Sequence, residues 1–214
     1  MEQITLQGAL PRVFRASFPG DSDIWNNDVS FSRGRLYLVE AASGKGKTSF
    51  CSYVYGSRDD YDGSILFDDQ AIPRLSPGAW GEIRRSSLGM VFQGLRLFPE
   101  LTAVENVCLK NRLTAFRDEA WIRAAFERLD IADKMDAPVA KISFGQQQRV
   151  ALIRALCQPL DFLLLDEPVS HLDEENCRRA GELLREEAAL HGFGIISTSI
   201  GKHVPLPYHG TFHL

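Results

Sequence analysis

Short apolar runs alternate with longer amphipathic stretches along most of the chain, and this spacing predicts strands and helices in turn. Residues 36–39 and 162–165 are continuously apolar, as expected of strands covered on both faces. Residues 28–32 alternate between polar and apolar, which predicts a half-buried strand. Further strands are predicted at the short runs 64–67, 88–92, 194–198 and 208–214.

Helical signals occupy much of the remaining chain. Ser76 followed by Pro77 predicts a helix start, and Thr102 with Glu105 three residues later is typical of a capping box. The pattern stays helical to about residue 140, with one apolar face predicted at Trp121, Ala124, Ala125 and Leu129. Further helices are predicted at 146–157 and 174–190.

The order of these elements predicts a single α/β domain, residues 1–214, with a mostly parallel core sheet. An antiparallel β region precedes this core, and a helical subdomain at about residues 94–145 is inserted in it.

One loop between a predicted strand and a predicted helix has the composition of a phosphate-binding loop. Small residues let successive backbone N–H groups surround a phosphate, and the following helix N-terminus adds partial positive charge. Lys47 is then expected to reach the β- and γ-phosphates, and the Thr48 hydroxyl to bind Mg²⁺. Ala41 stands where the motif G-x-x-x-x-G-K-[ST] has its first glycine, so a loop that binds nothing is the alternative. The loop is Ala41, Ala42, Ser43, Gly44, Lys45, Gly46, Lys47 and Thr48, and Ser49 follows it.

Two carboxylates follow the apolar run 162–165. Asp166 and Glu167 are expected at the carboxyl edge of the sheet, where open α/β sheets bind ligands. Asp166 is a candidate Mg²⁺ ligand, and Glu167 is a candidate general base for the water that attacks a γ-phosphate. Solvated acids at a strand end are the alternative.

A third signal is the start of the helix before that strand. Ser143 is a candidate N-cap, and Gln146 occupies the return position of a capping box. The free N–H groups of such a helix end suit an anion, although an ordinary helix start has the same pattern.

Composition narrows the classes of function. The net charge is −4 and no long basic run is present, which argues against a nucleic-acid partner. No apolar run approaches the roughly 20 residues that a membrane helix needs, so any membrane association is expected through a partner. The sequence begins without a recognisable secretory signal.

Together these motifs resemble the ATP-binding subunits of ABC transporters, over essentially the whole chain. The segment from Gly89 to Val107 is similar to the branch that serves lipoprotein release, macrolide export and cell division. The resemblance implies an ABC-type P-loop NTPase fold, ATP and Mg²⁺ as ligands, and ATP hydrolysis. It also implies a second ATP-binding subunit, in a homodimer or heterodimer, and an integral membrane permease subunit at the cytoplasmic face of the inner or plasma membrane.

The resemblance also assigns roles by position. Gln93 matches the glutamine that binds Mg²⁺ and senses the membrane subunit. Phe18 matches the aromatic residue that stacks on adenine, and the alternative is a core or edge aromatic. Ser143 and Gly145, with Gln146, match the signature that faces the partner's nucleotide. Asp173 matches an aspartate at the dimer interface. The implied catalytic residues are Glu167, Lys47 and Gln93, and the implied metal ligands are Thr48, Gln93 and Asp166.

Three positions depart from the family pattern. Alanine at position 41 is expected to be tolerated if its φ is negative. Phe144 replaces the first signature glycine, and Ser199 replaces a histidine that contacts the γ-phosphate, with His203 four residues later as a possible substitute. Loss of such a preorganised group typically lowers a rate by roughly 10²–10³-fold, so slow hydrolysis is expected. The alternative is a nucleotide-gated structural protein that hydrolyses little.

Overall fold

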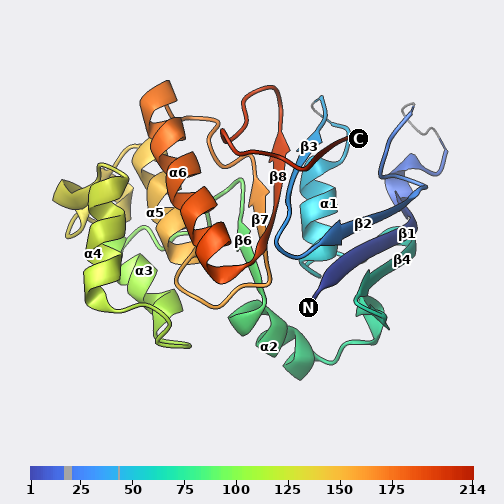
Figure 1. Ribbon diagram of the computed structural model, residues 1–214, viewed down its shortest axis with the longest axis horizontal. Coiled ribbons are helices and arrows are strands. Elements are labelled where there is room, and N and C mark those ends of the chain that lie inside the picture. The colour runs from blue at the N-terminus through green and yellow to red at the C-terminus, as the bar shows by residue number, and fades with distance from the viewer. Residues whose placement is uncertain (17–20, 43) are drawn as a thin grey trace.

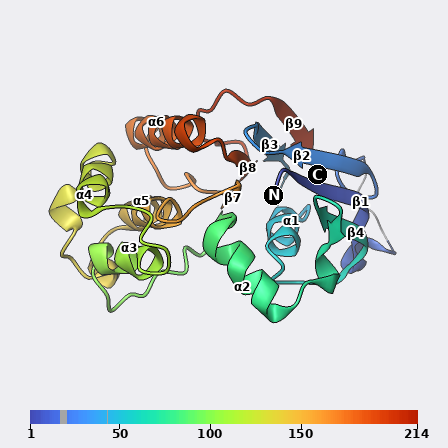
Figure 2. The same cartoon turned by 60° about the horizontal axis from the view of Figure 1, so that its bottom comes forward.

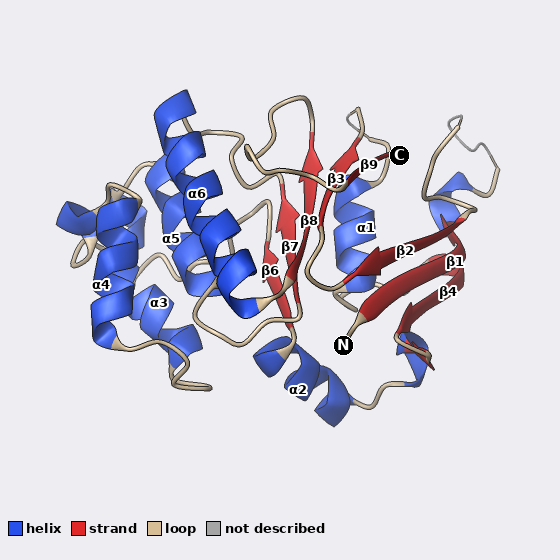
Figure 3. Cartoon of the chain, in the orientation of Figure 1, coloured by secondary structure: helices blue, strands red, loops and turns tan. Residues whose placement is uncertain are grey.

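The structure, a computed structural model, describes residues 1–16, 21–42 and 44–214. Two sheets organise the molecule (Figures 1 and 3). The first is parallel, with strand order β6-β7-β8-β3-β9, and the second is antiparallel, with order β2-β1-β4-β5. The parallel strands are β3 (Leu36–Glu40), β6 (Leu88–Val91), β7 (Phe162–Asp166), β8 (Gly194–Ser199) and β9 (Gly210–His213). The antiparallel strands are β1 (Gln3–Pro11), β2 (Asp28–Ser32), β4 (Tyr61–Phe67) and β5 (Gln70–Ala71).

Helices lie on both faces of the parallel sheet. One face is covered by α5 and α6, with α3 and α4 beyond them, while α1 lies between the two sheets (Figure 2). Each face has its own apolar core, and β7 is buried along its whole length between them. The helices are α1 (Lys47–Val54), α2 (Pro77–Ser86), α3 (Ala103–Asn111), α4 (Glu119–Arg128), α5 (Phe144–Ala155) and α6 (Glu174–His191).

The α/β fold with a parallel core sheet and an antiparallel β sheet is therefore confirmed. The predicted helix starts are also confirmed: Ser76 caps α2, and Thr102 and Ser143 form capping boxes on α3 and α5. No helix in the described ranges is both long and apolar enough to cross a membrane.

The helical signal from Thr102 to residue 140 is divided in the structure. After α3 the Asn111 side chain accepts from the Arg117 N–H at 2.9 Å and donates to the Arg117 carbonyl at 2.8 Å. These bonds close a loop in which Ala115 has a φ of 51°, and Asp118 then caps α4. The predicted apolar face was wrong in part, because Ala124 is exposed. The buried side of α4 consists of Ile122, Ala125 and Phe126, followed by Leu129.

Candidate nucleotide site

The predicted phosphate loop connects β3 to α1 and depends on its glycines. Gly44 and Gly46 have φ values of 81° and 96°, in the left-handed region that favours glycine. A Cβ on Gly46 would lie 3.2 Å from the Trp25 ring and 3.3 Å from the Phe14 ring. Ala41 is not among the described residues with positive φ, so its methyl group adds no left-handed strain there.

Lys47 opens α1 and folds back over its own loop. Its ammonium donates to the carbonyls of Ala41 at 2.8 Å and Ala42 at 2.9 Å, and its side chain is only 4% exposed. The ammonium also lies 3.9 Å from Glu167 Oε1. Burial lowers the pKa of Lys47, and the carboxylates of Glu167 and Asp166 oppose that shift.

The two predicted acids lie at the end of β7 and face different surroundings. Asp166 is buried, and its Oδ1 accepts from the Thr198 hydroxyl at 2.9 Å, while its Oδ2 has no hydrogen-bond partner. Burial raises the pKa of Asp166, and the hydroxyls of Thr198 and Thr48, with Lys47, oppose the rise. A buried oxygen without a partner carries a desolvation cost, which a bound cation would remove.

Glu167 is the next residue and has a left-handed backbone, with φ of 52°. Its N–H donates to Thr198 Oγ1 at 3.3 Å, and its Oε2 accepts from the Gln93 amide at 3.4 Å. A non-glycine residue with positive φ is uncommon, and such strain is concentrated at functional sites. Glu167 and Gln93 thus meet across the cleft, although they are far apart in the sequence.

These groups converge on a polar cleft of about 280 Å³. It contains the ammonium, hydroxyl, amide and carboxylate groups that phosphate and Mg²⁺ binding require, since Mg²⁺ prefers oxygen ligands. Thr48 and Gln93 offer such oxygens in the lining of the cleft, and the buried Asp166, which does not line it, offers another directly before Glu167. The lining of the cleft is Gly44, Gly46, Lys47, Thr48, Ser49, Gln93, Glu167 and Ile200.

The end of β8 differs from the expectation for position 199. Ser199 is fully buried, its hydroxyl has no hydrogen-bond partner, and its carbonyl accepts from the Ala41 N–H at 3.3 Å. The side chain that lines the cleft here is Ile200, which is 49% exposed. His203 lies beside Tyr208, with ring centroids 6.0 Å apart, and does not line this cleft. A contact between Ser199 and a nucleotide stays a prediction.

The predicted signature residues form a second surface at the start of α5. The Ser143 hydroxyl accepts from the Gln146 N–H at 3.3 Å, and Gln146 Oε1 accepts from the Ser143 N–H at 2.9 Å. A Cβ on Gly145 would lie 3.0 Å from the His171 carbonyl oxygen. The Phe144 ring stacks edge-on against His171, with centroids 4.5 Å apart, and remains 41% exposed.

This surface continues into the start of α6. Asp173 caps α6 by accepting from the Asn176 N–H at 2.8 Å, so it has a structural role in the single chain. Gln148, which the sequence reasoning missed, donates to Ser170 Oγ at 3.1 Å and accepts from the His171 N–H at 3.2 Å. The run of three glutamines at 146–148 was the available signal, but it does not reveal which one faces inward.

Trp25 was also missed, and it supports the loop directly. It is buried, and its indole N–H donates to the Lys45 carbonyl at 3.1 Å. The predicted Phe18 and Ser43 lie outside the described residues.

Comparison with known proteins decides the family. The family model described as ABC transporter matches residues 25–170, more than half of the chain. The chain belongs to the ABC transporter ATP-binding family. Its likeness to ATP-binding subunits extends over the phosphate loop, the signature segment and the paired acids.

Individual relatives support this assignment. An uncharacterized ABC transporter ATP-binding protein of Mycobacterium tuberculosis is 34% identical over 182 residues, which cover 84% of this chain and 55% of that protein. The chain therefore spans about half the length of the first such relatives. The lipoprotein-releasing system ATP-binding protein LolD of Myxococcus xanthus is 34% identical over 165 residues, covering 74% of this chain and 72% of LolD.

Solved structures share the fold. The dimeric cassette MJ0796 in a post-hydrolysis state with ADP and Pi gives a TM-score of 0.75 at 24% identity, covering 92% of this chain and 87% of that one. A bacterial Atm1-family ABC exporter with ATP bound gives 0.72 at 25% identity, covering 92% of this chain and 34% of that one. These likenesses confirm the predicted ABC cassette fold.

Proposed function

We propose that this chain is the ATP-binding and ATP-hydrolysing subunit of an ABC transporter-type membrane complex. The observation that supports it best is that Lys47 and Glu167 line one cleft, while the neighbouring Asp166 keeps its Oδ2 buried and without a partner. A binding loop alone has no need of a second, strained carboxylate at the place where a γ-phosphate would lie.

Each residue has a defined task in this proposal. Lys47 exchanges the carbonyls of Ala41 and Ala42 for phosphate oxygens of ATP, while the backbone of residues 42–49 surrounds the phosphates. Thr48, Asp166 and Gln93 hold Mg²⁺, which neutralises charge that develops on the phosphates. Glu167 orients the attacking water and accepts its proton.

The second half of each ATP site comes from another copy or a related subunit. The start of α5, with Ser143, Gly145 and Gln146, does not line the cleft of its own chain and presents N–H groups at the surface. We propose that this end and Asp173 face the nucleotide of the second subunit, so that ATP drives dimerisation. Dimeric cassettes among the solved structures support this arrangement.

The remaining partner is an integral membrane subunit, held at the cytoplasmic face of the membrane. It would bind the groove beside the segment from Gln93 to Phe98, whose apolar side chains Phe98, Leu109 and Leu113 are 54%, 38% and 54% exposed. An apolar patch of this kind marks a protein interface.

Hydrolysis is proposed to be slow, because Ser199 is buried and Ile200 lines the cleft in its place. The same observation favours one alternative, a nucleotide-gated structural protein that assembles a partner complex. The slow ATPase and the structural protein differ in whether phosphate is released when every partner is present.

Turnover and binding should be measured separately on the purified chain and on its complex with the membrane subunit. Glu167→Gln is expected to lower phosphate release by about 10²–10⁴-fold while ATP binding and ATP-dependent dimerisation persist. Glu127→Gln, an exposed acid on α4, is the matched control. Unchanged turnover in Glu167→Gln would exclude the proposed general base. Tight ATP-dependent dimers without phosphate release would favour the structural protein.

A further inference from the structure

One exposed histidine lies on the surface formed by the starts of α5 and α6. The His171 ring packs edge-on against the Phe144 ring, with centroids 4.5 Å apart, and the residue remains exposed. The His171 carbonyl oxygen lies 3.0 Å from the place of a Cβ on Gly145, so the two segments are in close backbone contact. The imidazole therefore lies directly beside the first turn of α5.

Two polar side chains hold this imidazole in one orientation. The Gln148 amide donates to Ser170 Oγ at 3.1 Å, and Ser170 Oγ lies 2.9 Å from His171 Nδ1. Because the hydroxyl oxygen accepts from Gln148, its own hydrogen is available for Nδ1. This assignment makes Nδ1 the acceptor and leaves the ring hydrogen on Nε2. Gln148 is only 1% exposed and also accepts from the His171 N–H at 3.2 Å, so the arrangement is fixed at its buried end.

The Nε2 end of the ring is left open. In the part of the chain that the structure describes, Nε2 of His171 has no hydrogen-bond or ion-pair partner. The acid two residues later, Asp173, uses its two carboxylate oxygens on the N–H and the side-chain amide of Asn176, each at 2.8 Å. An imidazole oriented by a second group, which a third group fixes, is the arrangement that aims a histidine at a substrate.

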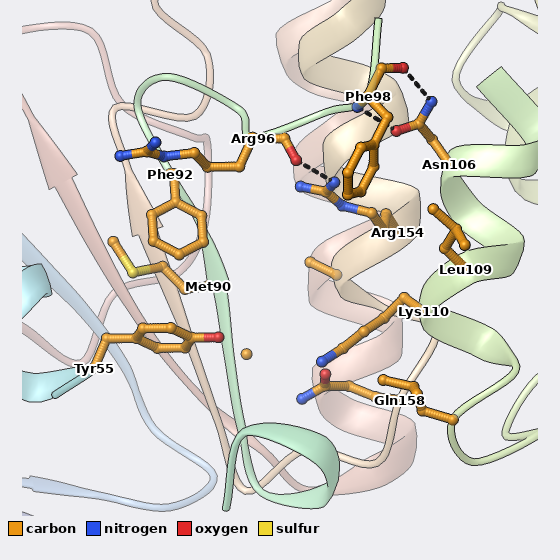
Figure 4. Close-up of a pocket in the computed structure, with 13 residues that line it drawn as sticks. Tyr55, Met90, Phe92, Arg96, Phe98, Asn106, Leu109, Lys110, Arg154 and Gln158 are labelled. Carbon is orange, nitrogen blue, oxygen red and sulfur yellow. Dashed lines mark hydrogen bonds between the residues drawn. The ribbon is translucent and has the colours of Figure 1, made fainter. Parts of the chain in front are cut away.

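The surface around His171 is separate from the groove at the other end of α5. Arg154, in the last turn of α5, lines that groove and donates to the Arg96 carbonyl (Figure 4). His171 lines neither that groove nor the nucleotide cleft of its own chain. Its open nitrogen is therefore available to a molecule that covers the start of α5, which in the proposed dimer is the second subunit with its nucleotide.

The nucleotide cleft has little positive charge of its own. Among the lining residues that the structure describes, Lys47 is the single cationic side chain, and Glu167 in the same lining is an acid. During phosphoryl transfer, negative charge is spread over the oxygens of the terminal phosphate, and hydrogen-bond donors placed there stabilise it. A donor from a second copy supplies what this lining lacks.

We propose that His171 is a catalytic residue in the site of a second copy of this chain, where its Nε2–H donates to the terminal phosphate of ATP. The inference rests on the proposed function, which supplies the ATP and the dimer. Water forms a bond to the terminal phosphorus as the bond to the bridging oxygen of ADP breaks, and Glu167 of the second copy accepts the water proton. His171 stabilises the phosphate oxygens and forms no covalent bond. Ser170 and Gln148 are positioning residues that act through the ring.

Phosphate release by the purified chain, and by its complex with the membrane subunit, tests the donor. His171→Ala is expected to lower kcat by roughly 10²–10³-fold with an unchanged melting temperature. His171→Gln places an amide N–H near the position of Nε2 and should retain more activity than His171→Asn, whose amide matches only the Nδ1 side. A structural role of the bond at Nδ1 predicts the opposite order. His213→Ala is the matched control, since that side chain is 65% exposed and does not line the cleft.

The positioning role of Ser170 is tested by combining variants. Ser170→Ala should lower kcat less than His171→Ala does, because the imidazole remains but is no longer oriented. The double variant should be no slower than His171→Ala alone, since residues that act through one group are not additive. Additive losses would exclude a positioning role.

Mixing two variants shows in which chain His171 acts. A mixed dimer of His171→Ala and Glu167→Gln has one site with an intact Glu167 and, from the other copy, an intact His171. If His171 acts across the dimer, these mixed dimers turn over ATP as fast as mixed dimers of the wild type and Glu167→Gln. If His171 acts within its own chain, both sites of the mixed dimer lack one group and no activity returns.

ATP-dependent dimerisation provides a readout that needs no phosphate release. In the Glu167→Gln chain, adding His171→Ala should weaken the ATP-bound dimer about tenfold, while ATP binding by the single chain does not change. An unchanged kcat in His171→Ala, or a mixture that recovers no activity, would overturn the inference. Dimers that need both ATP and His171 but release no phosphate would count against the proposed ATPase and leave the His171 contact intact.

Discussion

Arg154, in the last turn of α5, is predicted to hold the backbone of the loop that follows Gln93. Leu95 and Arg96 are consecutive non-glycine residues with φ of 53° and 52°. The Arg154 guanidinium donates to the Arg96 carbonyl at 2.6 Å and to the Leu95 carbonyl at 2.5 Å. The loop therefore keeps an unfavourable backbone next to two strong hydrogen bonds.

The balance can be worked out from these contacts. A left-handed backbone costs about 1–2 kcal/mol at each non-glycine residue, or about 2–4 kcal/mol for the pair. Two hydrogen bonds from a charged, partly buried donor contribute about 1.5–3 kcal/mol each. With Arg154 present, the hydrogen bonds slightly outweigh the backbone strain, so the observed loop conformation is favoured. Arg154→Met keeps much of the aliphatic volume but removes the donors, so the strain is no longer offset.

Hydrogen–deuterium exchange of residues 93–98 measures this change. In Arg154→Met both hydrogen bonds are lost, so opening of the loop becomes easier by about 3–6 kcal/mol, which corresponds to roughly 10²- to 10⁴-fold faster exchange of the loop amides. Exchange in β7 should not change. Arg185→Met, an exposed arginine on α6, is the control. Unchanged loop exchange in Arg154→Met would show that other contacts hold the left-handed pair.

Three further predictions concern other parts of the chain. Asp166→Asn should not lower the melting temperature of the nucleotide-free protein, because it removes a buried charge with an unpaired oxygen. It should abolish the additional stabilisation of the protein by Mg²⁺ in the presence of ATP, and thermal melts with Mg²⁺ or EDTA measure both effects. Arg117 and Glu187 form an ion pair whose side chains are only 7% and 6% exposed. Glu187→Gln leaves a buried arginine without its counter-charge and should lower the free energy of unfolding by about 3–5 kcal/mol. Adding Arg117→Met should restore much of the lost stability, as measured by guanidinium titrations. Hydrogen bonds from Asn176 lower the pKa of Asp173 in the folded protein. The ionised Asp173 therefore stabilises the fold at pH values above the pKa of the unfolded state, and this stability is lost as the pH falls through the folded pKa. Asp173→Asn should flatten the acid side of a profile of melting temperature against pH.

The fold was predictable because local and global signals agree. Capping residues such as Thr102 and Ser143 begin helices in the structure as they do in the pattern, and the apolar run before Asp166 is a strand buried on both faces. Strand order within the sheet was not predictable, since β3 pairs with β8 and β9 from the far end of the chain. Such pairing depends on tertiary packing that no local window contains.

The site was predictable where a motif fixes the backbone and less so where packing decides. Lys47 and Glu167 line one cleft and Asp166 precedes Glu167 at the end of β7, because the carboxyl ends of parallel strands share one edge; their roles stay predictions. Ser199 and Ile200 could not be distinguished from sequence, because only the end of β8 determines which of them faces the cleft. Trp25 was missed because its effect on Gly46 is a contact across about 20 positions of sequence.

Helix α5 connects three regions of the site: the signature segment at its start, the segment after Glu167, and the loop after Gln93. Ser143 caps its first turn, Gln148 in its middle contacts the segment after Glu167, and Arg154 lies in its last turn. At a rise of about 1.5 Å per residue, the helix spans roughly 18 Å as a single rigid body. A contact that moves its first turn must therefore displace Gln148 or Arg154, or break their hydrogen bonds. In the proposed dimer, the second subunit's nucleotide, the strained Glu167 and the loop after Gln93 are therefore expected to respond to one helix, and Arg154→Met should uncouple only that loop.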